Sequence, residues 1–258
     1  MYKRLLMSIT AVGLLAACNG DDEDNDEASN GDAEGEVTIS AAASTRDGLE
    51  EVVELFNEEN PDVSIDMNFG GSGALKIQIE QGAPADIFLS ANVDHFDDLD
   101  DDGFIEERVT YLGNDLVLIE PTDAETLSII EELVDVDLIA LGTPESVPAG
   151  EYGKAALEYY EIWGDIEDNI IYAEDVRQVL QYVEIGEVDA GIVYRTDALT
   201  SDDVVIVDTF TEDSHDAIEY PLGILTEGVD DEAVQAFYEF LQSDDALEVF
   251  EAYGFIIE

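Results

Sequence analysis

Apolar residues recur at two different spacings in the chain after residue 36. The sequence predicts strands at 37–40, 63–69 and 87–90, separated by helices at 49–56 and from Ala74 onward. The first of these helices has Leu49, Val52 and Phe56 on one face, and Asn60-Pro61 ends it. Strands that alternate with helices predict an α/β fold with a mainly parallel sheet.

The same alternation continues to the C-terminus. Phe96 and Leu99 mark an acid-coated helix, and further strands are predicted at 116–119, 138–141 and 191–194. Further helices are predicted at 124–133, 152–159, 176–183 and 234–250. Residues 37–258 are enough for one large or two modest domains.

A glycine-rich turn follows the predicted strand at 63–69. Its residues Gly70, Gly71, Ser72 and Gly73 open a helix, so free N–H groups and the positive end of the helix dipole would face an anion. Ser44 stands at the preceding strand-to-helix junction, in N-cap position. Ligands of open α/β sheets bind beyond the carboxyl ends of strands, where Ser44 and Ser72 both fall. A Gly-Ser turn is also a common plain turn, so its meaning depends on the rest of the chain.

The N-terminus has the pattern of an export signal. Lys3 and Arg4 precede an apolar run at 5–15, which is too short for a membrane span of about 20 residues. Leu15-Ala16-Ala17-Cys18 resembles the bacterial lipoprotein signal, which implies cleavage of a signal peptide at 1–17 and lipidation of Cys18. Cys18 is the only cysteine, so no internal disulfide is possible. The acidic segment 18–36 is predicted to be a flexible tether.

The charge balance is extreme. Sixty-five acidic residues against eight Lys and Arg give a formal net charge of −57, and no basic face exists for nucleic acid. A hydrophobic fraction of 46% nevertheless predicts a folded chain. We infer a protein adapted to high salt, where charge repulsion is screened. Acidic runs also suit calcium, although the loop pattern of an EF-hand is absent.

Residues for catalysis are few. His95 and His215 lie in acidic sequence with no cysteine or second histidine nearby to complete a metal site. His215 also has no nucleophile placed to form a triad with it. The stretch Gly70-Gly71-Ser72-Gly73-Ala74 lacks the last glycine of a nucleophile-elbow motif. We therefore expect a binding protein and no enzyme.

Several ordered motifs resemble the molybdate-binding proteins of bacterial ABC importers. They lie at 41–44, 69–75, 78–90, 147–150, 173–177 and 191–194, with a matching tail AFYEFL…FEAYGF. The resemblance runs from Val37 to the C-terminus and implies a type II periplasmic-binding-protein fold with two α/β lobes and two crossovers. Lobe 1 would comprise 37–113 plus 221–258, and lobe 2 would comprise 114–220, with the oxyanion held between them.

The resemblance also implies the ligands of the oxyanion. Ser44 and Ser72 would each give a hydroxyl and a backbone N–H, Ala149 and Val176 a backbone N–H, and Tyr194 its phenolic O–H. Each of the first four residues is also predicted to lie where a helix begins, and Tyr194 ends a predicted strand. Molybdenum or tungsten would be bound as the oxyanion through these same residues, and no cofactor is expected. Thr45 and Arg195 depart from the pattern of the family, and Arg46 and Arg195 would either pair with surface acids or raise the potential at the mouth of the cleft.

A donor-only site suits molybdate, because this tetrahedral dianion carries no proton near neutral pH. A protonated oxyanion such as hydrogen phosphate would have an unpaired proton there, which costs about 1–3 kcal/mol. The family implies a protein that binds molybdate or tungstate and delivers it to a membrane permease. We expect it to be an exported monomer that is lipid-anchored to the outer face of the cell membrane or is periplasmic. Sulfate binding in the same class, and an acidic calcium-dependent surface protein, remain the alternatives.

Overall fold

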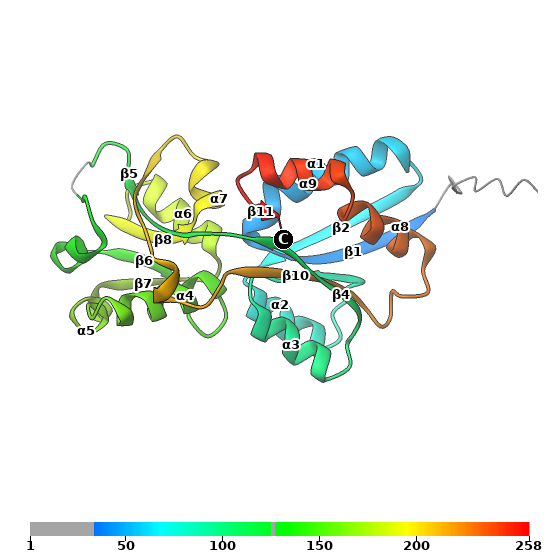
Figure 1. The fold of residues 1–258 in the computed structure, drawn as a ribbon, viewed down its shortest axis with the longest axis horizontal. Helices are drawn as coiled ribbons and strands as arrows, with labels where there is room; N and C mark the ends of the chain where they lie inside the picture. The colour runs from blue at the N-terminus through cyan, green and yellow to red at the C-terminus, as the bar shows by residue number, and fades with distance from the viewer. Residues whose placement is uncertain (1–33, 125–126, 258) are drawn as a thin grey trace, which may run out of the picture. The chain divides into compact units, whose positions relative to one another are not determined.

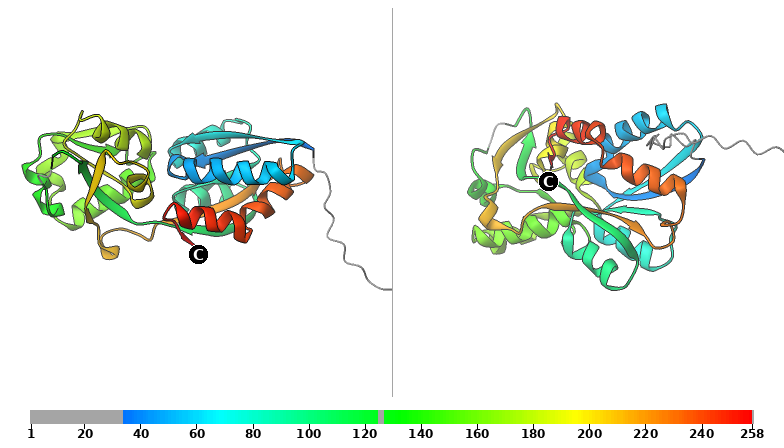
Figure 2. Two further views of the ribbon diagram at one scale, coloured as in Figure 1. Left: turned by 90° about the horizontal axis from the view of Figure 1, so that it is seen from above. Right: turned by 45° about the vertical axis from the view of Figure 1, so that its right-hand side comes forward.

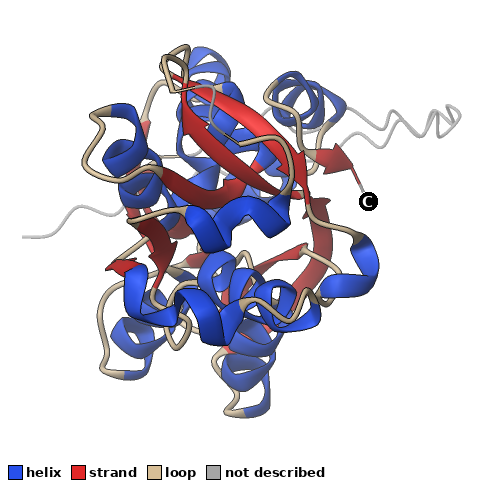
Figure 3. Cartoon of the chain, turned by 90° about the vertical axis from the view of Figure 1, so that its left-hand side faces the viewer, coloured by secondary structure: helices blue, strands red, loops and turns tan. Residues whose placement is uncertain are grey.

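The computed structural model describes residues 34–124 and 127–257, which belong to one compact unit. The predicted signal peptide at 1–17, Cys18 and most of the tether at 18–36 lie outside the described residues. The described strands form two sheets, one of six strands and one of five, called here the first and the second sheet (Figure 1). Helices lie around the strands (Figure 3). The sheets confirm the predicted α/β class.

The first sheet has the strand order β11-β4-β10-β3-β1-β2. Its strands are β1 (Gly35–Ala42), β2 (Val63–Gly70), β3 (Ile87–Leu89), β4 (Ile105–Gly113), β10 (Glu219–Leu225) and β11 (Ile256–Ile257). β1 pairs in parallel with β2 and β3, whereas β10 and β11 pair antiparallel with their neighbours. The carboxyl ends of β1 and β2 therefore lie side by side, which brings the segments after Ala42 and Gly70 together.

Helices from both ends of the chain pack on the first sheet. They are α1 (Arg46–Glu59), α2 (Ser72–Glu80), α3 (Val93–Asp101), α8 (Glu232–Leu241) and α9 (Asp244–Ala252), with a 3-10 turn, η1 (Ala43–Thr45), before α1. The two C-terminal helices return to the N-terminal part, where α9 contacts α1 and α8 contacts β1 (Figure 2). In α1, the predicted apolar face of Leu49, Val52 and Phe56 is buried. A satellite core that includes Leu75 and Ile79 fixes α2.

The second sheet has the order β7-β6-β8-β5-β9. Its strands are β5 (Leu116–Pro121), β6 (Ile139–Gly142), β7 (Ile170–Ala173), β8 (Ala190–Tyr194) and β9 (Val204–Thr209). Its helices are α4 (Pro148–Tyr159), α5 (Trp163–Ile166), α6 (Val176–Glu184) and α7 (Arg195–Leu199), with 3-10 turns η2 (Ile130–Asp135), η3 (Glu167–Asn169) and η4 (Glu212–Ser214). β6 and β8 are parallel, so the loops after both strands open on one edge of the sheet.

The chain passes between the sheets twice. It leaves the first sheet after Gly113 and enters the second at Leu116, and it leaves the second after Thr209 and re-enters the first at Glu219. The predicted lobe boundaries, 113/114 and 220/221, remain predictions at the level of single residues. Asn114 and Asp115 make up the whole of the first connection.

Three predictions about the strands and helices are wrong. The sheets are mixed, because four of the nine described strand pairings are parallel and five are antiparallel. The predicted helix at 124–133 is absent from the described part of that segment, where η2 buries Ile130 and Leu133 at the three-residue repeat of a 3-10 helix. The predicted helix at 234–250 is two helices, because Ser243 starts α9 by accepting a hydrogen bond from the Ala246 N–H at 3.3 Å.

Within the described residues, no helix is both long enough and apolar enough to cross a membrane.

Candidate functional site

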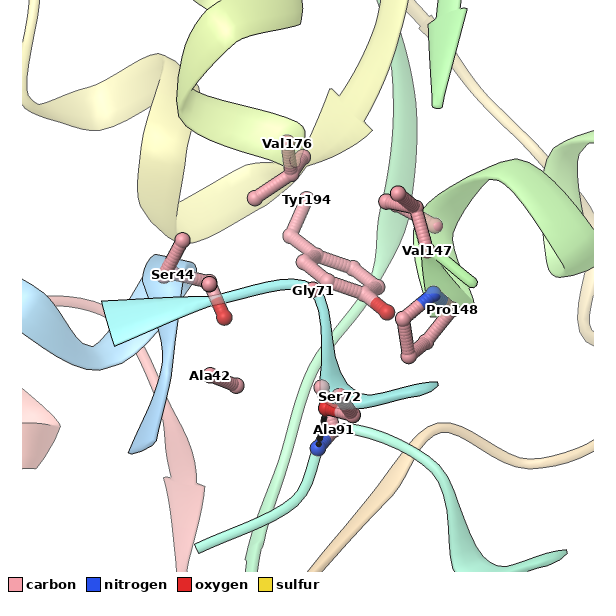
Figure 4. A pocket seen from close by; sticks show the side chains of 12 residues that line it. Ala42, Ser44, Gly71, Ser72, Ala91, Val147, Pro148, Val176 and Tyr194 are labelled. Atoms are coloured by element: carbon pink, nitrogen blue, oxygen red, sulfur yellow. Dashed lines mark hydrogen bonds between the residues drawn. The ribbon is translucent and has the colours of Figure 1, made fainter. Parts of the chain in front are cut away.

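One small pocket brings all five predicted site residues together. It is lined by segments of both sheets and encloses about 190 Å³ of empty space, including its opening to solvent. Its cavity volume in the sense used for published cavities is about 10 Å³, close to the roughly 10–15 Å³ that holds one water, so only a very small ligand fits. None of its twelve lining residues is charged (Figure 4): Ala42, Ala43, Ser44, Gly70, Gly71, Ser72, Ala91, Val147, Pro148, Ala149, Val176 and Tyr194.

The first sheet contributes two serines whose hydroxyl groups already have partners. Ser72 is the first residue of α2, and its Oγ accepts a hydrogen bond from the Ala91 N–H at 2.9 Å. Ser44 lies in η1, and its Oγ is 3.0 Å from the Tyr220 hydroxyl. The predicted N-cap role of Ser44 is wrong, because Thr45 is the residue before α1 and the Ser44 hydroxyl bonds to Tyr220 instead.

The second sheet contributes the starts of two helices. Pro148 opens α4 and has no N–H, and the Gly150 N–H bonds to the Val147 carbonyl, so Ala149 supplies the first N–H without an intrahelical acceptor. Val176 opens α6, and Asp175 caps that helix by accepting from the Gln178 N–H at 2.9 Å. The cap serves the third residue of α6, which leaves the Val176 N–H at the helix start.

Tyr194 completes the second-sheet side. It ends β8, is 1% exposed, and its hydroxyl has no hydrogen-bond partner among the described residues. Its ring lies between Ser44, Ser72 and Pro148 (Figure 4). Burial raises the pKa of Tyr194 well above its usual value, with smaller contributions from Tyr220 and Tyr152, so the hydroxyl keeps its proton. A buried unpaired hydroxyl costs about 1–3 kcal/mol, which a ligand that accepts its proton would recover.

Direct contacts join the two sides of the pocket. The Gly73 N–H donates to the Ser146 carbonyl at 3.1 Å, and the Arg177 guanidinium lies 2.7 Å from the Asp47 carboxylate. Gly71 passes so close that an added Cβ would lie 2.6 Å from the Ser146 carbonyl oxygen. The glycine run therefore has a role beyond its exposed N–H groups, since it lets the two sides meet.

Comparison with known proteins gives the family. The model of bacterial extracellular solute-binding proteins matches residues 37–256. This chain belongs to that family. A putative ABC transporter substrate-binding lipoprotein of Bacillus subtilis, YvgL, is 45% identical and covers 100% of this chain and 98% of its own. The molybdate-binding protein ModA of Escherichia coli is 38% identical over 87% of this chain and 90% of its own.

Solved structures agree with the fold. The substrate-binding domain of a putative molybdenum ABC transporter from Clostridium difficile is 34% identical with a TM-score of 0.67, and it covers 86% of this chain and 99% of its own. The periplasmic molybdate-binding protein of Azotobacter vinelandii has a TM-score of 0.77 at 21% identity, covering 86% and 99%. The second likeness shows the fold alone. The predicted periplasmic-binding-protein fold and family resemblance are thereby confirmed.

The two arginines near the pocket of this solute-binding protein are engaged elsewhere. Arg46 lies 3.6 Å from Glu50 and above the Phe69 ring, and Arg195 donates to Asp115 at 2.9 Å. Neither arginine lines the pocket. Ion pairing, one of the two predicted roles, is what the structure shows, so the pocket has no cation to bind an anion.

Sequence reasoning missed three residues around the site. Ala91 follows the predicted strand at 87–90, a position that could have revealed it as a strand-end residue. Tyr220 and Asn114 lie where the chain crosses between the sheets, and no local pattern links them to Ser44. Only the tertiary fold brings them together.

Neither histidine lines the pocket, although the His95 ring packs beside Gly73. His95 is on α3, and burial lowers its pKa, whereas His215 follows η4 and packs beside Tyr152. Across residues 34–124 and 127–257, no group of three or more His, Cys, Asp or Glu side chains is placed to hold a metal ion.

Proposed function

We propose that this protein captures molybdate or tungstate outside the cell and delivers it to the membrane permease of an ABC importer. The names of its relatives in Escherichia coli and Clostridium difficile support molybdate as the ligand. Under this proposal the protein is a binding protein without catalytic activity, needs no cofactor and acts as a monomer.

The observation that carries the proposal is the set of neutral donors in an uncharged pocket. Three hydroxyl groups, of Ser44, Ser72 and Tyr194, and the first N–H groups of α4 and α6, at Ala149 and Val176, meet there. Helix N-termini stabilise an anion without a buried counter-charge, whose desolvation would be expensive. Molybdate accepts from every donor and offers no proton in return. Tungstate has the same charge and shape and should bind comparably.

A thermal-shift and titration series in molar salt tests the proposal. We expect molybdate and tungstate to raise the Tm, with about 2.7 kcal/mol of stabilisation at a hundred times the dissociation constant. Hydrogen phosphate at the same concentration should do little. A larger shift with sulfate than with molybdate would assign the protein to the sulfate class, and a response to calcium alone would favour the acidic surface protein.

The same proposal includes lipid anchoring through Cys18, which the name of the Bacillus subtilis lipoprotein supports. Cys18→Ser should abolish membrane attachment and leave the oxyanion affinity unchanged, because every donor proposed for the oxyanion lies between residues 44 and 194. Fractionation of expressing cells and titration of the released protein measure both. Loss of oxyanion binding in this variant would give Cys18 a second role.

Adaptation to high salt is the last part of the proposal, and the net charge of −57 supports it. Screening lengths fall from about 30 Å at 0.01 M salt to about 3 Å at 1 M, so repulsion among the acids should weaken across that range. The Tm should rise with sodium chloride over this interval. Equal stability at both concentrations would contradict salt adaptation.

A further inference from the structure

A chain of hydrogen bonds runs from the connection between the sheets to the pocket. It begins at Asn114, which is buried between β4 and β5. The Asn114 Oδ1 accepts from the Asp115 N–H at 2.9 Å, so the orientation of the amide is fixed. Its Nδ2 then faces two oxygens and donates to Thr196 Oγ1 at 2.9 Å and to the Tyr220 hydroxyl at 3.2 Å.

The hydrogen bond from Asn114 also determines which way the Tyr220 hydroxyl donates. Its hydroxyl oxygen accepts from Asn114, and the one other partner it has among the described residues is Ser44 Oγ at 3.0 Å. Tyr220 is fully buried, and burial raises its pKa well above the usual value, so the phenol keeps its proton. If Ser44 donated to Tyr220, the phenolic proton would be buried without an acceptor. Tyr220 therefore donates and Ser44 accepts.

Ser44 consequently has its own proton left for the pocket. A hydroxyl group donates once, and the proton of Tyr220 already takes one of the two acceptor positions of the Ser44 oxygen, so the Ser44 proton is the group left for a ligand. Ser72 is oriented in the same sense by a different group, since its Oγ accepts from the Ala91 N–H. Both serines thus face the pocket as donors. At Ser72 a backbone group sets this direction, whereas at Ser44 a side chain that can be mutated sets it.

We propose that Asn114 and Tyr220 are positioning residues that select the protonation state of the ligand. By holding Ser44 as a donor, they make the pocket favour fully deprotonated tetrahedral oxyanions over those that carry a proton. A serine free to rotate could accept that proton and would lose this discrimination. The inference rests on the proposed function and deepens it.

A double-mutant cycle tests whether Tyr220 acts on the ligand through Ser44. Calorimetric titration with sodium molybdate in molar salt is carried out on wild type, Tyr220→Phe, Ser44→Ala and the double variant. Tyr220→Phe should weaken molybdate binding about three- to tenfold, the range of one hydrogen bond. In the Ser44→Ala background the same change should alter affinity by less than about twofold, because the group through which Tyr220 acts is gone.

Competition by hydrogen phosphate at pH 7.5 gives a readout that lost packing would not move. The ratio of phosphate to molybdate dissociation constants should fall at least about threefold in Tyr220→Phe, since Ser44 becomes able to accept a proton. Asn114→Leu should lower the same ratio by a smaller factor. It replaces Tyr220→Phe in the double-mutant cycle if Tyr220→Phe does not fold. Tyr111→Phe is the matched control, because Tyr111 is also a buried tyrosine of the first sheet but donates to the Leu241 carbonyl away from the pocket.

The outcomes separate the two proposals. Failure of the wild-type protein to bind molybdate would overturn the proposed function whatever the variants do. If wild type binds, two results would overturn the proposed positioning of Ser44 by Tyr220 and Asn114. One is an equal effect of Tyr220→Phe with and without the Ser44 hydroxyl, and the other is an unchanged selectivity ratio. An effect of Tyr111→Phe as large as that of Tyr220→Phe would also overturn it.

Discussion

The two sides of the pocket differ in whether their hydrogen-bonding groups already have partners within the protein. On the first-sheet side, the hydroxyl oxygens of Ser44 and Ser72 accept hydrogen bonds from the protein itself. On the second-sheet side, Tyr194 has a buried hydroxyl that no described residue pairs with, and Ala149 and Val176 stand at helix starts. The first side is organised before the ligand arrives, whereas the donors of the second side gain their acceptor from it.

Because of this difference, the two sides contribute differently to ligand affinity and to the stability of the empty protein. A donor that the protein leaves unpaired lowers the stability of the empty protein and raises affinity when an anion accepts from it. A hydroxyl that the protein already holds contributes to both states. Substitutions on the two sides should therefore have the same sign for affinity and opposite signs for the stability of the ligand-free protein.

The largest effect is expected at the start of α6. Val176→Pro removes one N–H, and proline is tolerated at the first position of a helix, where Asp175 already has the extended conformation that precedes proline (φ −154°, ψ 173°). Molybdate affinity should fall about a hundredfold or more, the upper range for a hydrogen bond to a charged group. Calorimetric titration measures this.

Val176→Ile is the matched control for that variant, because it keeps the N–H and changes only a buried side chain. It should bind within about threefold of wild type. A failure of Val176→Ile together with normal binding by Val176→Pro would place the anion away from α6.

The next largest effects on molybdate affinity are expected at Tyr194 and Ser72, one residue from each side of the pocket. Tyr194→Phe should weaken molybdate binding about ten- to a hundredfold and raise the Tm of the empty protein, because it removes a buried unpaired hydroxyl. Ser72→Ala should weaken binding to a similar degree but lower the Tm of the empty protein, because the Ala91 N–H loses its acceptor. Melting curves without ligand, combined with titrations, give both quantities. Equal Tm changes of the same sign would remove the distinction between the sides.

A feature of this structure could be predicted from the sequence when the residues that define it lie close together in the chain or in recognisable motifs. The helix of Leu49, Val52 and Phe56 was predictable because its apolar face is local, and the five pocket residues were predictable from ordered motifs. β10 was not predicted, because Pro221 and Gly223 weaken its strand pattern and its pairing partners are more than a hundred residues away.

The hydroxyl network escaped the sequence for the same reason. Ser44 and Tyr220 are 176 residues apart, and Asn114 and Tyr220 are 106 apart. No periodicity or spacing rule reaches over such distances. The N-cap expectation for Ser44 was reasonable locally and was overridden by this tertiary contact.

A smaller effect on affinity is expected where the two sides touch. Gly71→Ala keeps every donor and has an allowed backbone (φ −65°, ψ 135°), but its Cβ would lie 2.6 Å from the Ser146 carbonyl oxygen and 3.0 Å from that of Glu174. Overpacking of this kind costs about 1–3 kcal/mol, so affinity should fall about tenfold while the empty protein stays folded. Gly164→Ala, where a Cβ meets nothing within 4 Å, is the control. Wild-type affinity for Gly71→Ala would mean that the sides need not approach so closely.

The smallest effect on affinity, and a clear one on stability, is expected at Asp197. This fully buried carboxylate on α7 lies 3.5 Å from Arg177, which also pairs with Asp47 of the first-sheet side. We treat the contact as an ion pair without a hydrogen bond, since neither Asp197 oxygen has a hydrogen-bond partner among the described residues. Burial raises the pKa of Asp197 to about 7, Arg177 opposes the shift, and Asp175 and Asp47 add to it.

Because that folded-state pKa lies above the usual value of 3.8, the folded protein holds the Asp197 proton more tightly than the unfolded chain does. Its contribution to stability is therefore present at low pH and is lost as the pH rises through about 7. Between pH 5 and pH 8 wild type should lose roughly 2–3 kcal/mol of unfolding free energy through this group, a loss that Asp197→Asn should not show. Urea unfolding of both proteins across this interval isolates the difference from the other carboxylates, while molybdate affinity should change less than about twofold. Parallel pH profiles for the two proteins would show that Asp197 takes up no proton in this interval and that its ion pair with Arg177 persists throughout.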